Sequence, residues 1–426
     1  MPENLLVILK AMHFRHLYNR PMKNWKKNSL FFIGGQSISL FGSMLVQYAI
    51  MWHITLETRS GLIMTLSILA SFIPSLFLSP FAGVWVDRFN RKKIIILADS
   101  FIAITTLLTA VLFYFGYGSI TLLLVVSAFR SLGNAVQTPA VQAFIPELVP
   151  EDKLMKVQGI NNGIQSTMMI IAPVLSAALL ASVELFVIFF IDTVTAVLGI
   201  LTLLFYVNSI REQVKREGKV EYFNDIRMGI DYIKQHKFLV PFFIFTAMVL
   251  FFVAPIAFLS PLQTVFKFGP ETWRLSFVEV AFASGMMIGG FSIAAWEGLK
   301  NRIHTMALSL FFMGSFTIIL ALSNIFWAYL LAMFIIGLSL PYYNSPSYVM
   351  VQEKVESEYL GRVFSVMGMI SSSMMPIGMM VFGPLADFVD LNYIMIFSGL
   401  MMMLITIGLL FNKSLIIAGN KKLAVE

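Results

Sequence analysis

Long apolar segments separated by short polar ones run through almost the whole chain. Segments of about 20 apolar residues, the length that crosses a bilayer as a helix, lie near 29–51, 61–86, 94–115, 119–139, 159–181 and 184–206, and again near 241–262, 277–298, 304–323, 325–344, 363–386 and 392–411. The widest polar interval, 207–240, separates the first six from the last six. The pattern predicts an all-α integral membrane protein with twelve transmembrane helices in two groups of six.

Composition supports this class. Of the 426 residues, 58% are hydrophobic and 12% are charged, whereas a soluble domain carries about 25% charged residues. The chain has no cysteine, which excludes disulfides, thiolate metal sites and a cysteine nucleophile. The net charge of +7 would also suit a nucleic-acid partner, but the placement of the basic residues favours a membrane.

Lysine and arginine are concentrated on one side of the predicted membrane. If both termini are cytoplasmic, the inner segments hold 26 of the 30 basic residues and the outer loops hold three, Arg59, Lys267 and Arg274, with Arg130 inside a span. Because short cytoplasmic loops carry the excess of positive charge, we expect both termini in the cytoplasm and a multi-pass protein of the plasma membrane.

This orientation divides the chain into five parts. We expect a cytoplasmic N-terminal segment (1–28), an N-terminal six-helix bundle (29–206), a cytoplasmic linker (207–240), a C-terminal six-helix bundle (241–412) and a cytoplasmic tail (413–426). No cleavable signal peptide is visible, and residues 1–21 are interpreted as an extension without a role in transport.

The linker contains one amphipathic segment. Its apolar residues recur at helical spacing, at Phe223, Ile226, Ile230 and Ile233, with charged residues between them. This pattern predicts a helix lying on the inner membrane surface. A simple tether between the two halves is compatible with the same pattern.

The two groups of six spans show an internal repeat. Thr138-Pro139 near the end of span 4 is matched by Ser345-Pro346 near the end of span 10, and each is followed by an acidic segment. The loop after span 2 likewise has a shorter counterpart after span 8, Gly298-Leu299-Lys300-Asn301-Arg302. The repeat predicts two pseudo-symmetric bundles, with a substrate site between them near mid-membrane.

The loop after span 2 carries the pattern G-x-x-x-D-R-x-x-R-K-K over Gly83 to Lys93. A glycine lets two helices approach closely, an aspartate can cap a facing helix N-terminus, and a basic run stays on the cytoplasmic surface. The pattern resembles the signature loop between helices 2 and 3 of the major facilitator superfamily of secondary transporters. That resemblance implies a cytoplasmic gate, formed by Gly83, Asp87, Arg88, Arg91 and Lys92 closing on Gly361 and Arg362 at the start of span 11.

Across most of 22–412 the chain is similar to the macrolide efflux permeases, a drug–proton antiporter branch of that superfamily. The stretches that carry the similarity include Arg130-Ser131-Leu132-Gly133, Leu148-Val149-Pro150-Glu151, Phe282-Ala283-Ser284-Gly285-Met286 and Tyr359-Leu360-Gly361-Arg362-Val363-Phe364. The resemblance implies proton-coupled export of amphiphilic drugs across the plasma membrane of a bacterium, with macrolides as the first candidate substrates. The branch also contains siderophore exporters, so export of a siderophore, lipid or other metabolite is the alternative.

Polar groups inside the bilayer are candidate sites because they cost free energy unless they are paired. Span 1 places Gln36, Ser43 and Gln47 on one helix face, and span 4 does the same with Ser127, Arg130, Asn134 and Gln137. Helices 1 and 4 line the cavity in the superfamily, so Gln36, Ser43, Gln47, Asn134 and Gln137 are substrate-cavity candidates. Hydrogen bonding within the N-terminal half is the alternative.

Four acidic residues could carry protons, namely Asp99, Asp192, Glu279 and Glu57. Arg130 needs an acceptor, for which Asp99, Asp192 or a polar residue of span 1 qualifies. Together, Arg130 and Gly133 resemble the proton-coupling motif that the family carries in span 4. In this chain the glycine follows the arginine by three residues rather than four. We therefore take Arg130, Asp99, Asp192 and Glu279 as proton-coupling candidates, with Asp192 and Glu279 favoured as the groups that titrate.

Aromatic residues are dense in the second half, on spans 7 and 10. Phe251 and Tyr343 are cavity candidates there, because ring faces suit bulky amphiphiles and cations. Packing within the bundle or against lipid is the alternative.

Enzymatic chemistry is not indicated. No phosphate-binding loop, nucleophile–base pair or metal-ligand spacing is present, so we expect a secondary active transporter with no cofactor and no metal, driven by the proton gradient. The expected partners are membrane lipids and a small amphiphilic substrate, not nucleic acid. We expect a monomer, and the sequence implies no ATP-binding partner protein.

Overall fold

The computed structural model describes residues 24–207, 222–296, 298–356 and 359–420, apart from the side chains of residues 80, 87, 151–152 and 222–226. This part of the chain is helical and contains no β-strand. Twelve of its helices are long and apolar enough to cross a bilayer. The helices are α2 (Trp25–Thr58), α3 (Gly61–Arg88), α4 (Arg91–Tyr114), α5 (Ile120–Leu148), α6 (Glu151–Ser182), α7 (Leu185–Tyr206), α8 (Tyr222–Gln235), α9 (Leu239–Phe268), α10 (Thr272–Trp296), α11 (Arg302–Leu322), α12 (Phe326–Lys354), α13 (Leu360–Leu385), α14 (Leu391–Phe411) and α15 (Lys413–Gly419).

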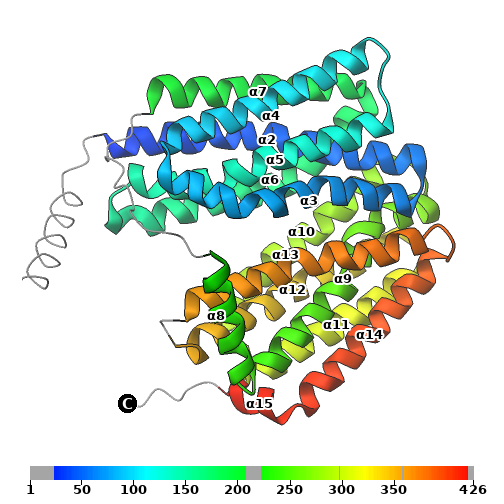
Figure 1. The fold of residues 1–426 in the computed structure, drawn as a ribbon. Helices are drawn as coiled ribbons and strands as arrows, with labels where there is room; N and C mark the ends of the chain where they lie inside the picture. Colours follow the sequence, from blue (N-terminus) through cyan, green and yellow to red (C-terminus); the bar gives the residue numbers. More distant parts are fainter. Residues whose placement is uncertain (1–23, 208–221, 297, 357–358, 421–426) are drawn as a thin grey trace, which may run out of the picture.

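The transmembrane helices form two halves, α2–α7 and α9–α14, which lie one above the other in Figure 1. The expected bundle limits differ from the helix ends by a few residues. α2 begins at Trp25 rather than 29 and α9 begins at Leu239 rather than 241, because a helix continues past its apolar run wherever its own backbone bonds are satisfied. Residues 1–21, interpreted from the sequence as an extension, lie outside the described residues.

The packing within one half is repeated in the other. In the first half α2 packs on α7, α3 on α5, and α4 on both α5 and α7. In the second half the corresponding pairs are α9 with α14, α10 with α12, and α11 with both α12 and α14. The two halves are therefore built on the same plan, as the internal repeat predicts.

Three residues at corresponding positions show the repeat at the level of side chains. Asn90 caps the N-terminus of α4, and Asn301 caps the N-terminus of α11. The next residue in each case, Arg91 or Arg302, forms an ion pair with a glutamate near the end of the neighbouring helix, Glu147 on α5 or Glu353 on α12. The short basic segment after span 8 is thus a structural counterpart of the signature loop.

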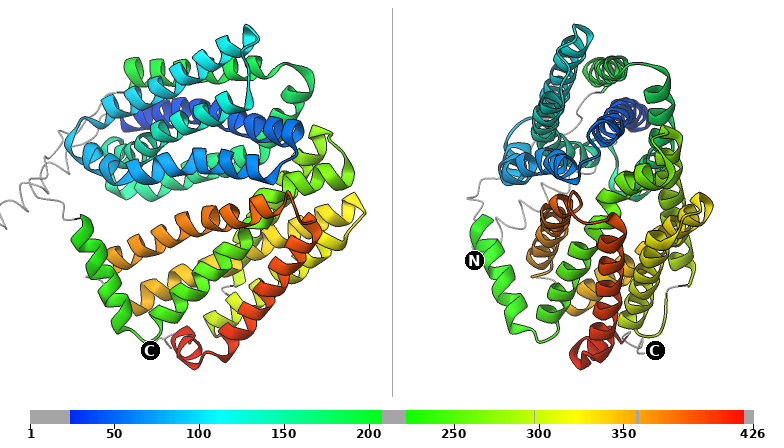
Figure 2. Two further views of the ribbon diagram at one scale, coloured as in Figure 1. Left: turned by 45° about the vertical axis from the view of Figure 1, so that its right-hand side comes forward. Right: turned by 90° about the vertical axis from the view of Figure 1, so that its right-hand side faces the viewer.

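The two halves contact each other through α3 with α13 and α6 with α10. Among the described residues, every hydrogen bond between the halves lies at the end of the molecule where α2 turns into α3, which we call the closed end. Toward the opposite end, where α3 turns into α4, the two halves diverge, as Figure 1 and the left view of Figure 2 show. We call that the open end.

The linker helix α8 lies at the open end, across the start of α13 (Figure 1). Its Tyr232 is buried and stacks on Tyr359, with ring centroids 4.5 Å apart, and a Cβ added at Gly229 would lie 2.9 Å from the carbonyl oxygen of Arg362. The helix predicted from the sequence is therefore present and packs on the C-terminal half, while its place on the inner membrane surface stays a prediction. The side chains of Phe223 and Ile226, part of that prediction, are outside the described residues.

Candidate functional site

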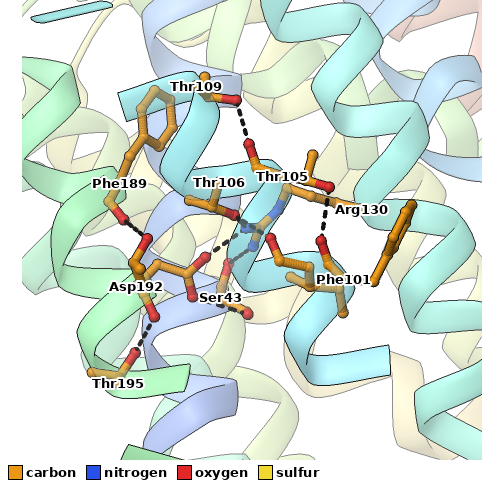
Figure 3. Close-up of polar contacts among 11 residues, drawn as sticks. Ser43, Phe101, Thr105, Thr106, Thr109, Arg130, Phe189, Asp192 and Thr195 are labelled. Atoms are coloured by element: carbon orange, nitrogen blue, oxygen red, sulfur yellow. Dashed lines mark hydrogen bonds and ion pairs between the residues drawn. The ribbon is translucent and has the colours of Figure 1, made fainter. Parts of the chain in front are cut away.

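A buried ion pair joins two helices of the N-terminal half. The guanidinium of Arg130 on α5 lies 2.5 Å from the carboxylate of Asp192 on α7 (Figure 3). Arg130 also donates to the hydroxyl of Thr106 on α4, and Ser43 on α2 donates to Asp192 over 3.1 Å. Four helices thus contribute to one cluster, which we call the Arg130 cluster.

A glycine allows α2 to reach this cluster. A Cβ added at Gly42 would lie 2.0 Å from the hydroxyl of Thr195 and 3.1 Å from the Cα of Asp192. Only a residue without a side chain permits this approach of α2 to α7. The neighbouring residue, Ser43, is thereby placed within hydrogen-bond distance of Asp192.

A second buried cluster contains a carboxylate without a cation. Asp99 on α4 accepts a hydrogen bond of 3.0 Å from the amide of Gln36 on α2. The amide of Gln137 on α5 donates to Gln36 over 2.9 Å. We call these residues the Asp99 cluster. Of the three acceptors that the sequence left open for Arg130, the structure selects Asp192 together with Ser43, whose carbonyl oxygen lies 3.4 Å away.

The acidic candidates therefore differ in their surroundings. The charge of Asp192 is balanced by Arg130, whereas Asp99 has only neutral amide partners. Glu279 on α10 is partly buried and forms no hydrogen bond or ion pair with any described residue. A buried carboxylate that lacks a cation carries an uncompensated desolvation cost, which binding a proton removes.

The most deeply buried charges lie in the N-terminal half. Among the described residues, the charged side chains in the buried class are Asp99, Arg130, Glu147 and Asp192, and all four belong to α4, α5 or α7. The core of the C-terminal half is apolar and aromatic, with Phe242, Tyr329 and Met350 among its buried residues.

A cavity of about 470 Å³ lies between α3 and α5 of the first half and α13 of the second. Its wall is mostly apolar in area but carries several polar side chains. The polar residues are Ser71, Ser75, Ser79, Ser131, Asn134, Thr138, Gln142 and Ser372. A cavity of this size and lining can accept a sizeable amphiphile through both apolar contact and hydrogen bonds.

The predicted cavity residues of the first half fall into three groups. Asn134 lines this cavity. Gln36, Gln137 and Ser43 are engaged in the two buried clusters, as the alternative interpretation anticipated. Gln47 is exposed on α2.

Sequence reasoning missed the serines of span 2. Ser71, Ser75 and Ser79 recur every four residues, which places them on one face of α3. That spacing is the signal that could have identified them.

The aromatic candidates pack within the C-terminal half. Phe251 contacts the rings of Phe252 and Phe382, with centroids 5.1 and 5.3 Å away. Tyr343 is buried in the same core. Both residues therefore pack within the bundle, which was the alternative interpretation, and neither is among the residues that line the cavity.

The basic residues of the signature loop bind their own half. Arg91 donates to the carbonyl oxygen of Ala143 and to Glu147 on α5, at 2.8 and 3.0 Å. Lys92 donates to the carbonyl oxygens of Leu204 and Val207 at the end of α7. The sequence expectation placed Arg91 in a clamp against the start of span 11. In this structure its described contacts instead join α4 to α5, because the open end holds the two halves apart.

The other gate residues lie apart at the open end. Gly83 and Gly361 each have open space where a Cβ would be added. Arg88 is exposed, and the guanidinium of Arg362 lies over the ring of Tyr359, 5.5 Å from its centroid. The side chain of Asp87 is outside the described part of the chain.

In the described part of the chain, twelve helices long enough to cross a membrane form two repeated halves, with a buried ion pair in one half and a cavity between the two. This is the architecture of a polytopic membrane transporter. The sequence model of the Major Facilitator Superfamily matches residues 30–379. The chain belongs to that superfamily.

Individual relatives agree with this assignment. The chain is 34% identical over 391 residues to macrolide efflux protein A of Streptococcus pyogenes, covering 90% of this chain and 95% of that protein. It is 35% identical over 327 residues to macrolide efflux protein A of Enterococcus faecalis, covering 75% and 99%. Among solved structures, a bacterial homologue of the iron transporter ferroportin in an inward-facing state superimposes with a TM-score of 0.69 at 15% identity, covering 89% of this chain and 98% of that one.

Proposed function

We propose that this protein exports amphiphilic drugs from the bacterial cytoplasm in exchange for protons, with macrolides as the first candidate substrates. The cargo is suggested by the two macrolide efflux proteins to which the chain is similar over most of its length. The 470 Å³ cavity, with its mixed polar and apolar wall, has the character that an amphiphilic substrate requires.

The observation that carries the proposed mechanism is the restriction of inter-half hydrogen bonds to the closed end. Two rigid halves that touch at one end can rock about the central cavity and expose it to either side in turn. The excess of basic residues at the open end supports a cytoplasmic location for that end, and hence for both termini. In this assignment the structure represents the state that loads substrate from the cytoplasm.

Proton coupling is assigned to the acidic residues that lack a cationic partner, Asp99 and Glu279. In the outward-open state an external proton binds the carboxylate and neutralises it. After the halves rock back, the proton leaves to the cytoplasm and the cavity accepts the next substrate. Asp192, whose charge Arg130 balances, holds α5 to α7 throughout, so we do not retain the sequence preference for Asp192 as a titrating group.

The energy is sufficient for export. One proton that moves through about 100 mV releases about 2.3 kcal/mol, which supports about fifty-fold accumulation of a neutral solute.

The test is efflux of radiolabelled erythromycin from cells that express the protein, measured with and without a protonophore. We expect expression to lower intracellular erythromycin several-fold, and the protonophore to abolish the difference. Equal accumulation with and without the protein would overturn the assigned cargo. Efflux that persists after the protonophore would overturn proton coupling.

A further inference from the structure

At the closed end, a carboxylate of one half binds the first turn of a helix in the other half. Asp387 follows α13, and its two carboxylate oxygens accept from the backbone N–H of Gly61 at 2.6 Å and of Leu62 at 3.2 Å. The hydroxyl of Ser60 donates to the same carboxylate over 2.9 Å. A carboxylate from the C-terminal half therefore caps α3.

This cap completes the N-terminus of α3. A helix begins with four N–H groups that have no partner within the helix. In α3, Asp387 accepts from the N–H groups of Gly61 and Leu62, the hydroxyl of Ser60 accepts from that of Ile63, and the hydroxyl of Thr58 accepts from that of the cap residue itself. Separation of the halves would leave two of these donors, and the positive end of the helix dipole, to water.

Close backbone contact places the carboxylate in this position. A Cβ added at Gly61 would lie 2.2 Å from the carbonyl oxygen of Gly383, and one added at Gly383 would lie 1.6 Å from the hydroxyl of Thr65. That hydroxyl also donates across the interface to the carbonyl oxygen of Met379 over 3.3 Å. The two helices can approach this closely because both contact positions are glycine.

Two glycines and an aspartate recur with the same spacing in both helices. α3 contains Gly61, Gly83 and Asp87, and 300 positions later Gly361, Gly383 and Asp387 occupy the corresponding places in and after α13. The two helices run in opposite directions between the open and closed ends. Consequently the start of each helix lies at the same end of the molecule as the Gly-x-x-x-Asp of the other.

The described glycines of the two sets differ in their surroundings. Gly61 and Gly383 touch at the closed end, whereas Gly83 and Gly361 at the open end have open space around them. We infer that α3 and α13 form a reciprocal latch, in which Asp387 caps α3 and holds the outer side shut while the cytoplasmic side is open, and releases it when Asp87 takes the corresponding place at the start of α13.

The inference rests on the alternating access of the proposed function and adds Asp387 to it as a positioning residue. The free energy gained at one end offsets the free energy lost at the other, so each state is held by a cap of similar strength. An N-cap is worth about 0.5–2 kcal/mol, which corresponds to a change of about two- to thirty-fold in the ratio of the two states.

Distance measurements between spin labels test this directly. The chain has no cysteine, so an introduced pair reports without background. Tyr117 and Ile325, both exposed near the closed end of opposite halves, form one pair, and Met155 and Ile417, both exposed near the open end, form the other.

Asp387→Asn removes the negative charge at the start of α3 and one of the two oxygens that accept from Gly61 and Leu62. We expect it to lengthen the closed-end distance and shorten the open-end distance, with a several-fold change in the ratio of the two states. Asp387→Glu, which keeps the carboxylate, should restore much of the original distribution. Asp87→Asn should act in the opposite direction. The matched control is Asp390→Asn in the same turn, because Asp390 caps α14 within its own half.

Two outcomes would overturn the latch. If both distances in Asp387→Asn match those of the unsubstituted protein or of Asp390→Asn, Asp387 does not position the halves. If Asp387→Asn lowers thermal stability without moving either distance, its role is structural only. In both cases labelled-erythromycin efflux still tests the proposed function separately, whereas an unsubstituted protein that shows one state under every condition would contradict alternating access itself.

Discussion

The guanidinium of Arg130 and the carboxylate of Asp192 lie 2.5 Å apart in the interior of the N-terminal half, where the exposed fractions of their side chains are 8% and 0%. A pair so deep in the bundle stabilises the arrangement of α5 and α7 only while both members are present. Loss of one partner leaves a buried charge uncompensated. Removal of either partner alone should therefore destabilise the folded protein.

Asp192→Ala should destabilise the protein by about 3–5 kcal/mol, because it leaves Arg130 buried and unpaired. The double variant Arg130→Met with Asp192→Leu should recover most of that loss, since apolar residues of similar volume carry no desolvation cost. Denaturant titration of the purified protein in detergent measures both values. A double variant as unstable as the single one would show that the charge itself is not the cause.

Asp99→Asn should keep the fold and remove proton coupling. The carbonyl oxygen of an asparagine can still accept from Gln36, so the Asp99 cluster keeps its hydrogen bond while losing the ionisable group. We expect unchanged abundance in the membrane and erythromycin efflux that no longer responds to an imposed pH gradient. Gln137→Glu, which adds an ionisable group to the same cluster, is a useful comparison. Retained gradient-driven efflux in Asp99→Asn would exclude Asp99 as the proton carrier.

Ser75→Trp should reduce macrolide export several-fold by filling part of the 470 Å³ cavity. The matched control is Phe77→Trp, two residues away on α3, because Phe77 is exposed away from the cavity. Drug susceptibility at equal protein abundance measures the effect. If both variants transport equally well, the cavity between α3, α5 and α13 is not on the substrate path.

Gly285→Ala should destabilise the C-terminal half by about 1–3 kcal/mol, the usual cost of overpacking. A Cβ at Gly285 would lie 2.0 Å from the carbonyl oxygen of Phe334, so α10 would have to move away from α12. Gly290→Ala, on the same helix but with open space around it, should be neutral or slightly stabilising, because alanine restricts the unfolded chain. Equal stability of the two variants, measured by thermal unfolding, would contradict the close contact.

The fold was predictable because the features that determine it are continuous stretches of the sequence. Runs of about 20 apolar residues define the spans, and the recurrence of Thr138-Pro139 as Ser345-Pro346 indicates the two halves. Corresponding helices then pack in corresponding pairs, as with α4 on α5 and α11 on α12.

The candidate site was only partly predictable, because it depends on how helices rotate against one another. The sequence identified Arg130 and its possible acceptors, but only the rotation of α7 distinguishes Asp192 from Asp99 as its partner. Ser71 and its neighbours on α3 were overlooked because serine is common in transmembrane helices and carries no charge. Tyr343 was predicted to line the cavity because an aromatic ring suits an amphiphilic substrate. In the structure it is buried in the core of the C-terminal half instead.

The most deeply buried charges belong to α4, α5 and α7, whereas the core of the C-terminal half is largely apolar and aromatic. Natural selection for a new cargo can therefore act on residues of the C-terminal half other than Glu279. The acids assigned to proton coupling are then retained, so a change of cargo need not change the source of energy.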